Sequence, residues 1–298
     1  MSEEIKLSGE PEPVEGGIVA ELERMTPEER AEHEAEVAGV VAPDREIKAG
    51  VGDTLLRLDE VTLRFGGLVA LDSVSFDIRR GEILGLIGPN GAGKTTCFNV
   101  MTGVYRPTSG QVLLEEQPLG KRKRHEITQL GIARTFQNIR LFGEMTALEN
   151  VVVGADARHK TSVLGALGRV PRHHREEREA VERGMALLEF MGIADRAADK
   201  GKNLPYGYQR RLEIARALAT EPKLLCLDEP AAGFNPAEKE ELMGLIRKIR
   251  DDGYTVLLIE HDMRLVMGVT DRIVVLEFGR KIAEGSPAEV SRDPKVIA

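Results

Sequence analysis

One short segment constrains the fold of this chain more than any other. Residues 88–96 read Gly-Pro-Asn-Gly-Ala-Gly-Lys-Thr-Thr and match the P-loop pattern G-x-x-x-x-G-K-[ST]. The segment follows the apolar run Ile83–Ile87 and opens a helical stretch, which is the strand–loop–helix context that a P-loop requires. Its glycines let backbone N–H groups turn inward around phosphate oxygens, and the N-terminus of the helix adds its positive end. The sequence therefore predicts a site for nucleotide phosphates.

The residues of this loop have separate chemical roles. We expect Lys94 to place a point charge at the β and γ phosphates, and Thr95 to place its hydroxyl on Mg²⁺. A chance glycine-rich turn is the alternative, and the flanking strand and helix argue against it. The expected nucleotide-binding residues of the loop are Gly88, Asn90, Gly91, Ala92, Gly93, Lys94, Thr95 and Thr96.

A second strand-like run ends in two carboxylates. Leu224–Leu227 is continuously apolar, and Asp228 and Glu229 follow it directly. Asp228, at the tip of the strand, can reach the coordination shell of Mg²⁺, and Glu229 can polarise a water for in-line attack on the γ phosphate. Acidic residues often begin loops, so this pair gains its meaning from the P-loop upstream. It is a candidate Walker B segment.

The rest of the chain alternates between short apolar runs and helical stretches. Thr255–Ile259 is apolar at consecutive positions, which is typical of a parallel strand buried on both faces. Helical periodicity at Tyr208–Ala219 and Pro236–Arg250 separates such runs, so the pattern predicts an α/β fold with helices on both sides of a sheet. Between about 145 and 203 the pattern is helical without a convincing strand, and we interpret that segment as a helical insertion.

The charge of the chain is unevenly distributed. Its 298 residues carry 41 Lys and Arg against 49 Asp and Glu, a formal net charge of −8. Residues 1–52 hold fourteen acidic and five basic side chains, so residues 53–298 are near neutral. We therefore divide the chain into an acidic leader at 1–52, whose composition favours disorder, and a folded domain at 53–298. Within the leader, Thr26 at an N-cap and Glu29 at N3 form the pattern of a helix start.

Several classes of protein are excluded by what the sequence lacks. No run approaches the roughly 18 apolar residues of a membrane-spanning helix, and the first residues do not follow the signal-peptide pattern. Cys97 and Cys226 lie among apolar neighbours and are too few for a disulfide scaffold. A reducing cytosol is the natural compartment for such a chain.

The order of the motifs resembles that of the ATPase subunits of ABC transporters. The resemblance covers the chain from about residue 55 to its end. It implies an ABC-type P-loop fold with a mixed sheet, a small antiparallel β region and a helical subdomain inserted at about 145–203. The matching segments are the P-loop, Gln137 in Arg134–Asn138, Pro205–Arg211, Asp228-Glu229, and His261 in Ile259–Asp262.

The resemblance also implies roles for residues outside the P-loop. Phe65 would stack on adenine, the alternative being an ordinary exposed aromatic at a strand end. Gln137 would touch Mg²⁺ or water and face the membrane subunit. His261 would contact the γ phosphate and act with Glu229 in catalysis, although a lone histidine after a strand is usually structural. The implied Mg²⁺ ligands are Thr95, Gln137 and Asp228.

The signature segment departs from the family pattern Leu-Ser-Gly-Gly-Gln. The residues here are Pro205, Tyr206, Gly207, Tyr208 and Gln209. Pro205 has neither a hydroxyl nor a backbone N–H, so it cannot donate to a γ phosphate as serine would. In this family the signature completes the ATP site of the opposite subunit, so the departure concerns the partner's site. Asn235 is a second departure, at a position where the dimer-contact loop commonly has Asp.

Several strings are similar to one subgroup, the larger ATPase of branched-chain amino-acid uptake systems. They are Phe65–Leu68, Arg134–Phe142 and Ala231–Pro236. The resemblance implies an ATP hydrolase that uses ATP and Mg²⁺ and sits peripherally on the cytoplasmic face of the inner membrane. The implied partners are transmembrane permease subunits, a second ABC ATPase in a hetero- or homodimer, and indirectly a solute-binding protein.

Two other functions within the same family stay open. One is an ATPase of a lipid or lipopolysaccharide exporter, and the other is a soluble ABC ATPase without membrane partners. Nucleic acid is not an expected partner. The basic run Lys121–His125 lacks interleaved aromatic residues, so we interpret it as a solvated loop.

Overall fold

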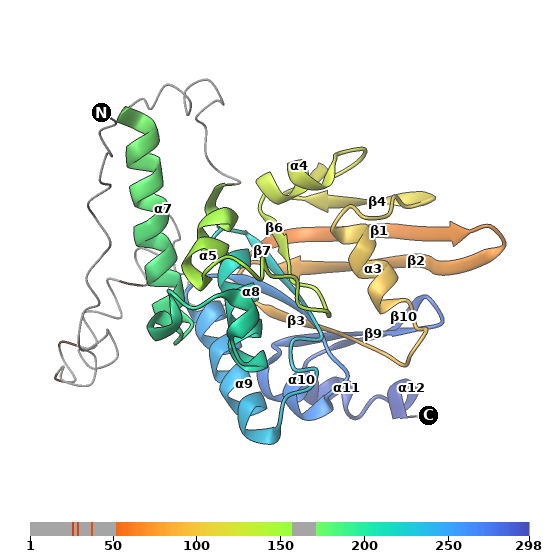
Figure 1. Cartoon of the computed structure of the whole chain (residues 1–298). Coiled ribbons are helices and arrows are strands. Elements are labelled where there is room, and N and C mark those ends of the chain that lie inside the picture. The colour runs from red at the N-terminus through yellow and green to blue at the C-terminus, as the bar shows by residue number, and fades with distance from the viewer. Residues whose placement is uncertain (1–25, 27–28, 30–36, 38–51, 157–170, 298) are drawn as a thin grey trace, which may run out of the picture.

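The structure, a computed structural model, describes residues 52–156 and 171–297 together with Thr26, Glu29 and Val37 (Figure 1). The predicted leader therefore lies largely outside the described residues. Thr26 and Glu29 form a capping box at the predicted helix start: the Thr26 N–H donates to Glu29 Oε2 at 2.8 Å, and the Glu29 N–H donates back to Thr26 Oγ1 at 3.3 Å.

A six-stranded mixed sheet forms the centre of the fold, in the order β10-β9-β3-β8-β7-β6. All neighbouring strands are parallel except β10, which is antiparallel to β9. Every residue of β3, β7 and β8 is buried, as the continuous apolar runs predicted. The carboxyl ends of the five parallel strands therefore share one edge of the sheet. The strands are β3 (Ile83–Ile87), β6 (Ile132–Arg134), β7 (Leu224–Asp228), β8 (Thr255–Ile259), β9 (Arg272–Glu277) and β10 (Arg280–Gly285).

A separate antiparallel sheet has the order β2-β1-β4-β5 and lies at the right of Figure 1. Arg272 joins the two sheets, because its guanidinium contacts Asp77 at 3.0 Å on β2 and Glu82 at 2.9 Å before β3. The expected antiparallel region is thus present. Its strands are β1 (Thr54–Phe65), β2 (Leu68–Arg79), β4 (Ser109–Leu114) and β5 (Gln117–Pro118).

Most helical residues lie toward the left of Figure 1, away from the antiparallel sheet. Between β6 and β7 the described chain is helical apart from loops and one isolated β-bridge, Thr146 to Lys200. The helices are α3 (Lys94–Met101), α4 (Arg124–Gln129), α5 (Ala147–Asp156), α7 (Pro171–Phe190), α8 (Tyr206–Leu218), α9 (Pro236–Asp251), α10 (Met263–Val269), α11 (Pro287–Val290) and α12 (Pro294–Ile297), with 3₁₀ turns η1 (Ala194–Arg196) and η2 (Gly201–Asn203).

The two faces of the mixed sheet are covered differently. Alternate residues of each strand point to opposite faces, so Leu225 and Leu227 of β7 join the core formed with α5, α7, α8 and α9. Leu224 and Cys226 instead join the core formed with α3 and the antiparallel sheet. The α/β fold is therefore as predicted, with the addition that one face is shared between a helix and a second sheet. The domain boundaries at 53 and at about 145–203 stay a prediction.

Candidate functional site

Four loops that carry predicted site residues leave the same edge of the mixed sheet. The P-loop follows β3, the Gln137 loop follows β6, Glu229 follows β7 and His261 follows β8. Because β3, β8, β7 and β6 are consecutive neighbours, these four loops are also neighbours in space. The carboxyl edge of a parallel sheet is where open α/β folds bind their ligands.

The P-loop owes its shape to glycines packed against the core. Gly88 has a φ of +148°, and a Cβ there would lie 2.0 Å from the Leu276 carbonyl oxygen. Gly93 has a φ of +99°, and a Cβ there would lie 2.9 Å from the Ala70 carbonyl oxygen. Neither position can accept a side chain, so the glycines of the motif are required both for conformation and for space.

Lys94, the first residue of α3, turns its side chain back over the loop. Its ammonium donates to the Gly88 carbonyl at 2.6 Å and to the Pro89 carbonyl at 3.1 Å. Burial lowers the pKa of Lys94, and the nearby Glu229 carboxylate opposes that shift. Thr95 is exposed at the start of the same helix. The loop thus has an ammonium and an exposed threonine at the start of α3, the residue types that a phosphate site requires.

Asp228 is held at the tip of β7 by a residue for which the sequence predicted no role. Arg134, the last residue of β6, donates through Nη2 to Asp228 Oδ2 at 3.1 Å and through Nη1 to Asn99 Oδ1 at 2.6 Å. The Arg134 guanidinium lies between the rings of Phe98 and Phe136. Burial raises the pKa of Asp228, and Arg134 opposes that shift. Arg134 therefore fixes the direction of the carboxylate.

Glu229 lies beside Gln137 and His261, two residues that the sequence analysis assigned to the same site. Gln137 Nε2 donates to Glu229 Oε2 at 2.7 Å, and His261 Nδ1 lies 3.9 Å from the same oxygen. The backbone of Glu229 has a φ of +46°, a conformation that costs a non-glycine residue energy and is concentrated at functional sites. Its N–H donates to the Ile259 carbonyl at 2.9 Å, which anchors the turn on β8.

Glu260 supports this arrangement and was not among the predicted site residues. It is buried, and its carboxylate accepts from the N–H of Ala231 at 2.8 Å and from the N–H of His261 at 3.2 Å. It therefore ties the loop after Glu229 to the loop of His261. The sequence signal was available, because a carboxylate directly after a buried apolar strand needs a partner.

Phe65 stands at the end of β1 with its ring 45% exposed. The ring of Tyr105 packs edge-on against it, with centroids 5.2 Å apart. An exposed aromatic face supported from one side can stack on a base. The role of Phe65 in stacking on adenine stays a prediction, and Tyr105 supports its ring.

The signature residues lie at the start of α8. Pro205 is the N-cap residue and makes no side-chain cap, and Tyr206 is 45% exposed. Tyr206 also packs edge-on against Phe234 of the loop before α9, at 6.0 Å between ring centroids. Asn235 caps α9 by accepting from the Glu238 N–H at 3.0 Å, which gives this amide a structural use. The described contacts bring none of these residues to Lys94 or Glu229.

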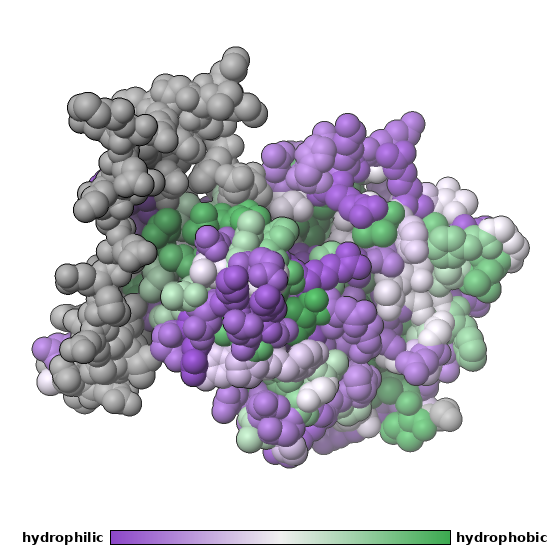
Figure 2. Space-filling view, in the orientation of Figure 1, coloured by the Kyte–Doolittle hydropathy of each residue, from purple (hydrophilic) through white to green (hydrophobic). Residues whose placement is uncertain are grey.

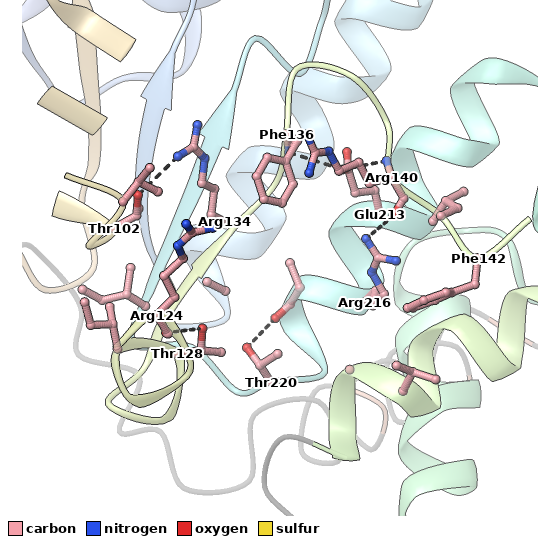
Figure 3. A pocket seen from close by; sticks show the side chains of 18 residues that line it. Thr102, Arg124, Thr128, Arg134, Phe136, Arg140, Phe142, Glu213, Arg216 and Thr220 are labelled. Atoms are coloured by element: carbon pink, nitrogen blue, oxygen red, sulfur yellow. Dashed lines mark hydrogen bonds between the residues drawn. The ribbon is translucent and has the colours of Figure 1, made fainter. Parts of the chain in front are cut away.

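Residues of the Gln137 loop, α4, α5 and α8 together line a groove (Figure 3). Its volume is about 580 Å³, and its rim carries the cations Arg124, Arg140 and Arg216. Phe142 and Val153 are exposed along it, and Figure 2 shows apolar residues gathered over α5. The Gln137 loop therefore borders two sites: Phe136 and Arg140 line the groove, and the Gln137 side chain contacts the carboxylate of Glu229.

No membrane-spanning helix is found within residues 52–156 and 171–297. Those ranges also contain no group of three or more His, Cys, Asp or Glu side chains arranged to hold a metal ion. A divalent cation here would depend on the Thr95 hydroxyl, the Asp228 carboxylate and the Gln137 amide. Such a sparse oxygen set suits Mg²⁺ held mainly by substrate phosphates and water.

The chain matches known sequence families in two places. The profile of the family described as ABC transporter matches residues 71–232, and that described as branched-chain amino acid ATP-binding cassette transporter matches residues 280–298.

Curated relatives are similar over most of the chain. The high-affinity branched-chain amino acid transport ATP-binding protein LivG of Salmonella typhimurium is 48% identical over 244 residues, which cover 82% of this chain and 96% of the relative. LivG of Escherichia coli is 47% identical and BraF of Pseudomonas aeruginosa 46% identical, with the same coverage.

Solved structures agree with the fold. A nucleotide-free ATP-binding cassette from an ABC transporter matches with a TM-score of 0.71 and 34% identity, over 82% of this chain and 98% of that chain. An ATP-binding cassette of an ABC transporter in its ADP conformation matches with a TM-score of 0.72 and 34% identity, over 82% of this chain and 97% of that chain.

Proposed function

The chain belongs to the ABC transporter family of ATP-binding cassettes, and on that premise we propose that it is the ATP-hydrolysing subunit of an importer for branched-chain amino acids. The observation that carries the ATPase assignment is the convergence of the P-loop, Asp228, Glu229, Gln137 and His261 at one sheet edge. The substrate class is supported by relatives of 46–48% identity that are described as branched-chain amino acid transport proteins.

The P-loop and Lys94 would bind the triphosphate. Backbone N–H groups of the loop surround the phosphate oxygens, and the Lys94 ammonium moves from the Gly88 and Pro89 carbonyls to the β and γ phosphates. The negative charge of the phosphates favours the protonated form of Lys94 and so offsets the effect of burial on its pKa. Phe65 would stack on the adenine ring.

Glu229 would position the attacking water for in-line displacement at the γ phosphate. Its contact with Gln137 occupies one carboxylate oxygen, and His261, 3.9 Å from the same oxygen, would contact the γ phosphate. When bound, Mg²⁺ would neutralise phosphate charge, with Thr95, Asp228 and Gln137 as its ligands from the protein. Arg134 would hold Asp228 in the direction that this requires.

The groove beside the Gln137 loop would receive the permease subunits at the cytoplasmic face of the inner membrane. It joins an exposed apolar surface to the loop that contacts Glu229, so a docked segment could sense the state of the ATP site. Of the signature residues Pro205–Gln209, Pro205 and Tyr206 are exposed at the start of α8 and the other three are half-buried. They would complete the ATP site of a second ATPase subunit, and a solute-binding protein would act through the permease.

The proposal is tested with a tagged copy purified in detergent from native membranes. We expect hydrophobic permease chains and a second ATPase to co-purify, and proteoliposomes of the complex to import labelled leucine, isoleucine or valine only with ATP. ATP-dependent extraction of lipid without amino-acid uptake would assign the chain to an exporter instead. Purification without any membrane partner would support a soluble ATPase.

A further inference from the structure

Helix α8 contains an ion pair that is entirely removed from solvent. Arg210 has no exposed surface, Glu213 is 1% exposed, and Arg210 Nη1 lies 2.7 Å from Glu213 Oε2. Charged side chains are almost never buried without partners, because desolvation of each ion costs several kcal/mol. The pair is therefore expected to make further hydrogen bonds to groups nearby.

Four hydrogen bonds join the pair to the backbone of the Gln137 loop, whereas Arg210 Nε has no hydrogen-bond partner among the described residues. Arg210 Nη1 donates to the Phe136 carbonyl at 2.7 Å, and Nη2 donates to the Gln137 carbonyl at 2.8 Å. Glu213 Oε1 accepts from the N–H groups of Phe136 at 3.3 Å and Arg140 at 3.4 Å. Figure 3 shows Glu213 facing the loop at Arg140. Two side chains of α8 thus hold both ends of a five-residue turn by its main chain.

The same pair also contacts the signature. Arg210 Nη2 donates to the Tyr206 hydroxyl at 3.3 Å, and Tyr206 is the first residue of α8. At the other end, the Gln137 side chain donates to Glu229 Oε2 at 2.7 Å. A continuous chain of contacts therefore runs from Glu229 through the Gln137 loop and Arg210 to Tyr206.

We propose that Arg210 and Glu213 are positioning residues that make the Gln137 loop and the start of α8 move as one body. They set the place of Gln137 against Glu229 in the subunit's own ATP site. They also transmit any movement of that loop to the signature offered to the partner's site. The inference rests on the proposed function, since it presumes that the Gln137 loop responds to nucleotide and that Pro205–Gln209 faces a partner.

A purely structural role makes a different prediction. If the pair only satisfied loop backbone groups, its removal would lower stability and leave the communication between the two segments intact. If the pair is a mechanical link, its removal should leave a folded protein in which ATP still affects the Gln137 loop but no longer affects the start of α8. Replacing a buried ion pair by apolar residues of similar volume is often neutral for stability, so the two roles can be separated.

The experiment compares Arg210→Met/Glu213→Leu with Arg211→Met in the full-length chain. Arg211 is the next residue of α8 and also loses an ion pair, with Glu241, but it does not contact the Gln137 loop. Each variant carries Glu229→Gln to retain ATP, and amide hydrogen exchange is measured with and without ATP. We expect ATP to protect both the Gln137 loop and the start of α8 in the parent and in the Arg211 variant. In the double variant we expect ATP to protect the loop alone.

A second readout uses the complete transporter with Glu229 intact. We expect the number of amino acids transported per ATP hydrolysed to fall at least about fivefold in the double variant. A fivefold change corresponds to the lower end of ordinary coupling energies. Protection of α8 by ATP in a folded double variant would overturn the proposal. If the double variant does not fold, the single variants Arg210→Lys and Glu213→Gln are measured in the same assays. Each is close in size to the native residue, but Arg210→Lys loses the two-pronged guanidinium and Glu213→Gln loses the negative charge. A parent complex without ATP-driven uptake would instead overturn the proposed function.

Discussion

The P-loop and the signature segment each lead the backbone into the start of a helix, but their surroundings differ. The P-loop follows a fully buried strand. Its glycines at 88 and 93 have positive φ angles, and neither position has room for a Cβ atom. The signature segment follows the short 3₁₀ turn η2, and Pro205 has a φ of −55°, which any residue adopts. Lys94 is 9% exposed, whereas Tyr206 is 45% exposed.

This difference separates a site that one chain builds from a surface that needs a second chain. The core of this subunit alone fixes the P-loop, so substitutions there should alter nucleotide binding in the isolated chain. The signature segment presents exposed groups away from Lys94 and Glu229, so substitutions there should act only in the assembled transporter. Four substitutions test this contrast, in order of decreasing effect.

Glu229→Gln is expected to have the largest effect. The amide keeps the shape of the side chain and can still accept a hydrogen bond from Gln137, but it cannot take a proton from water. Hydrolysis should fall by about 10²- to 10⁴-fold, the usual contribution of a general base, while ATP affinity stays unchanged. Phosphate release and calorimetric ATP titration measure the two quantities. Glu240→Gln on the exposed surface of α9 is the control, and normal turnover in the Glu229 variant would remove Glu229 from the mechanism.

Lys94→Ala should weaken ATP binding rather than turnover alone. The variant loses a charge-assisted contact with the phosphates, and a loss of about 1.5–3 kcal/mol corresponds to roughly 10- to 150-fold in the dissociation constant. Calorimetry on the isolated chain measures it, with Lys223→Ala as a surface control. The same loss is expected in the isolated chain and in the complex. An effect confined to the complex would contradict the view that one chain builds this half of the site.

Sequence patterns predicted most of the phosphate-binding half because its determinants are local. Glycine spacing, Lys94 and the strand-end carboxylates each follow from a short segment with a known conformation. Arg134, Arg210 and Glu213 could not be assigned in the same way. Each acts through a partner from another element, and the partner of Arg210 is the backbone of residues 136 and 137, which leaves no trace in side-chain identity.

Phe65→Ala should reduce ATP affinity by a smaller factor. Stacking of one base on an aromatic ring contributes about 1–3 kcal/mol, which is roughly 5- to 150-fold, with a lower bound below that for Lys94. Phe65→Trp is the matched variant, since it keeps the aromatic face, and affinity should return. The chain has no other Trp, so its fluorescence reports on this position alone. Equal affinity in the Ala and Trp variants, with no fluorescence change on adding ATP, would show that the base lies elsewhere.

Pro205→Ser should have the smallest effect. Whether that effect occurs in the isolated chain or only in the assembled transporter tests the contrast between the P-loop and the signature segment. Serine restores a backbone N–H and adds a hydroxyl at an N-cap position that makes no side-chain cap here. The capping bond would contribute about 1 kcal/mol, and the loss of proline would cost about 0.4–1 kcal/mol through the unfolded chain. Thermal stability should therefore change little.

In the assembled transporter, the new donors of Pro205→Ser should strengthen nucleotide-dependent closure at the partner's ATP site. A net hydrogen-bond contribution of about 0.5–1 kcal/mol corresponds to a two- to fivefold rise in ATPase rate at limiting ATP. Pro205→Ala restores the N–H without the hydroxyl, so the pair of variants separates the two donors. ATP affinity of the isolated chain should be identical in all three proteins, because Pro205 lies away from its own P-loop. A changed affinity in the isolated chain would mean that the signature segment also serves the subunit's own site, and the contrast between the two helix starts would fail.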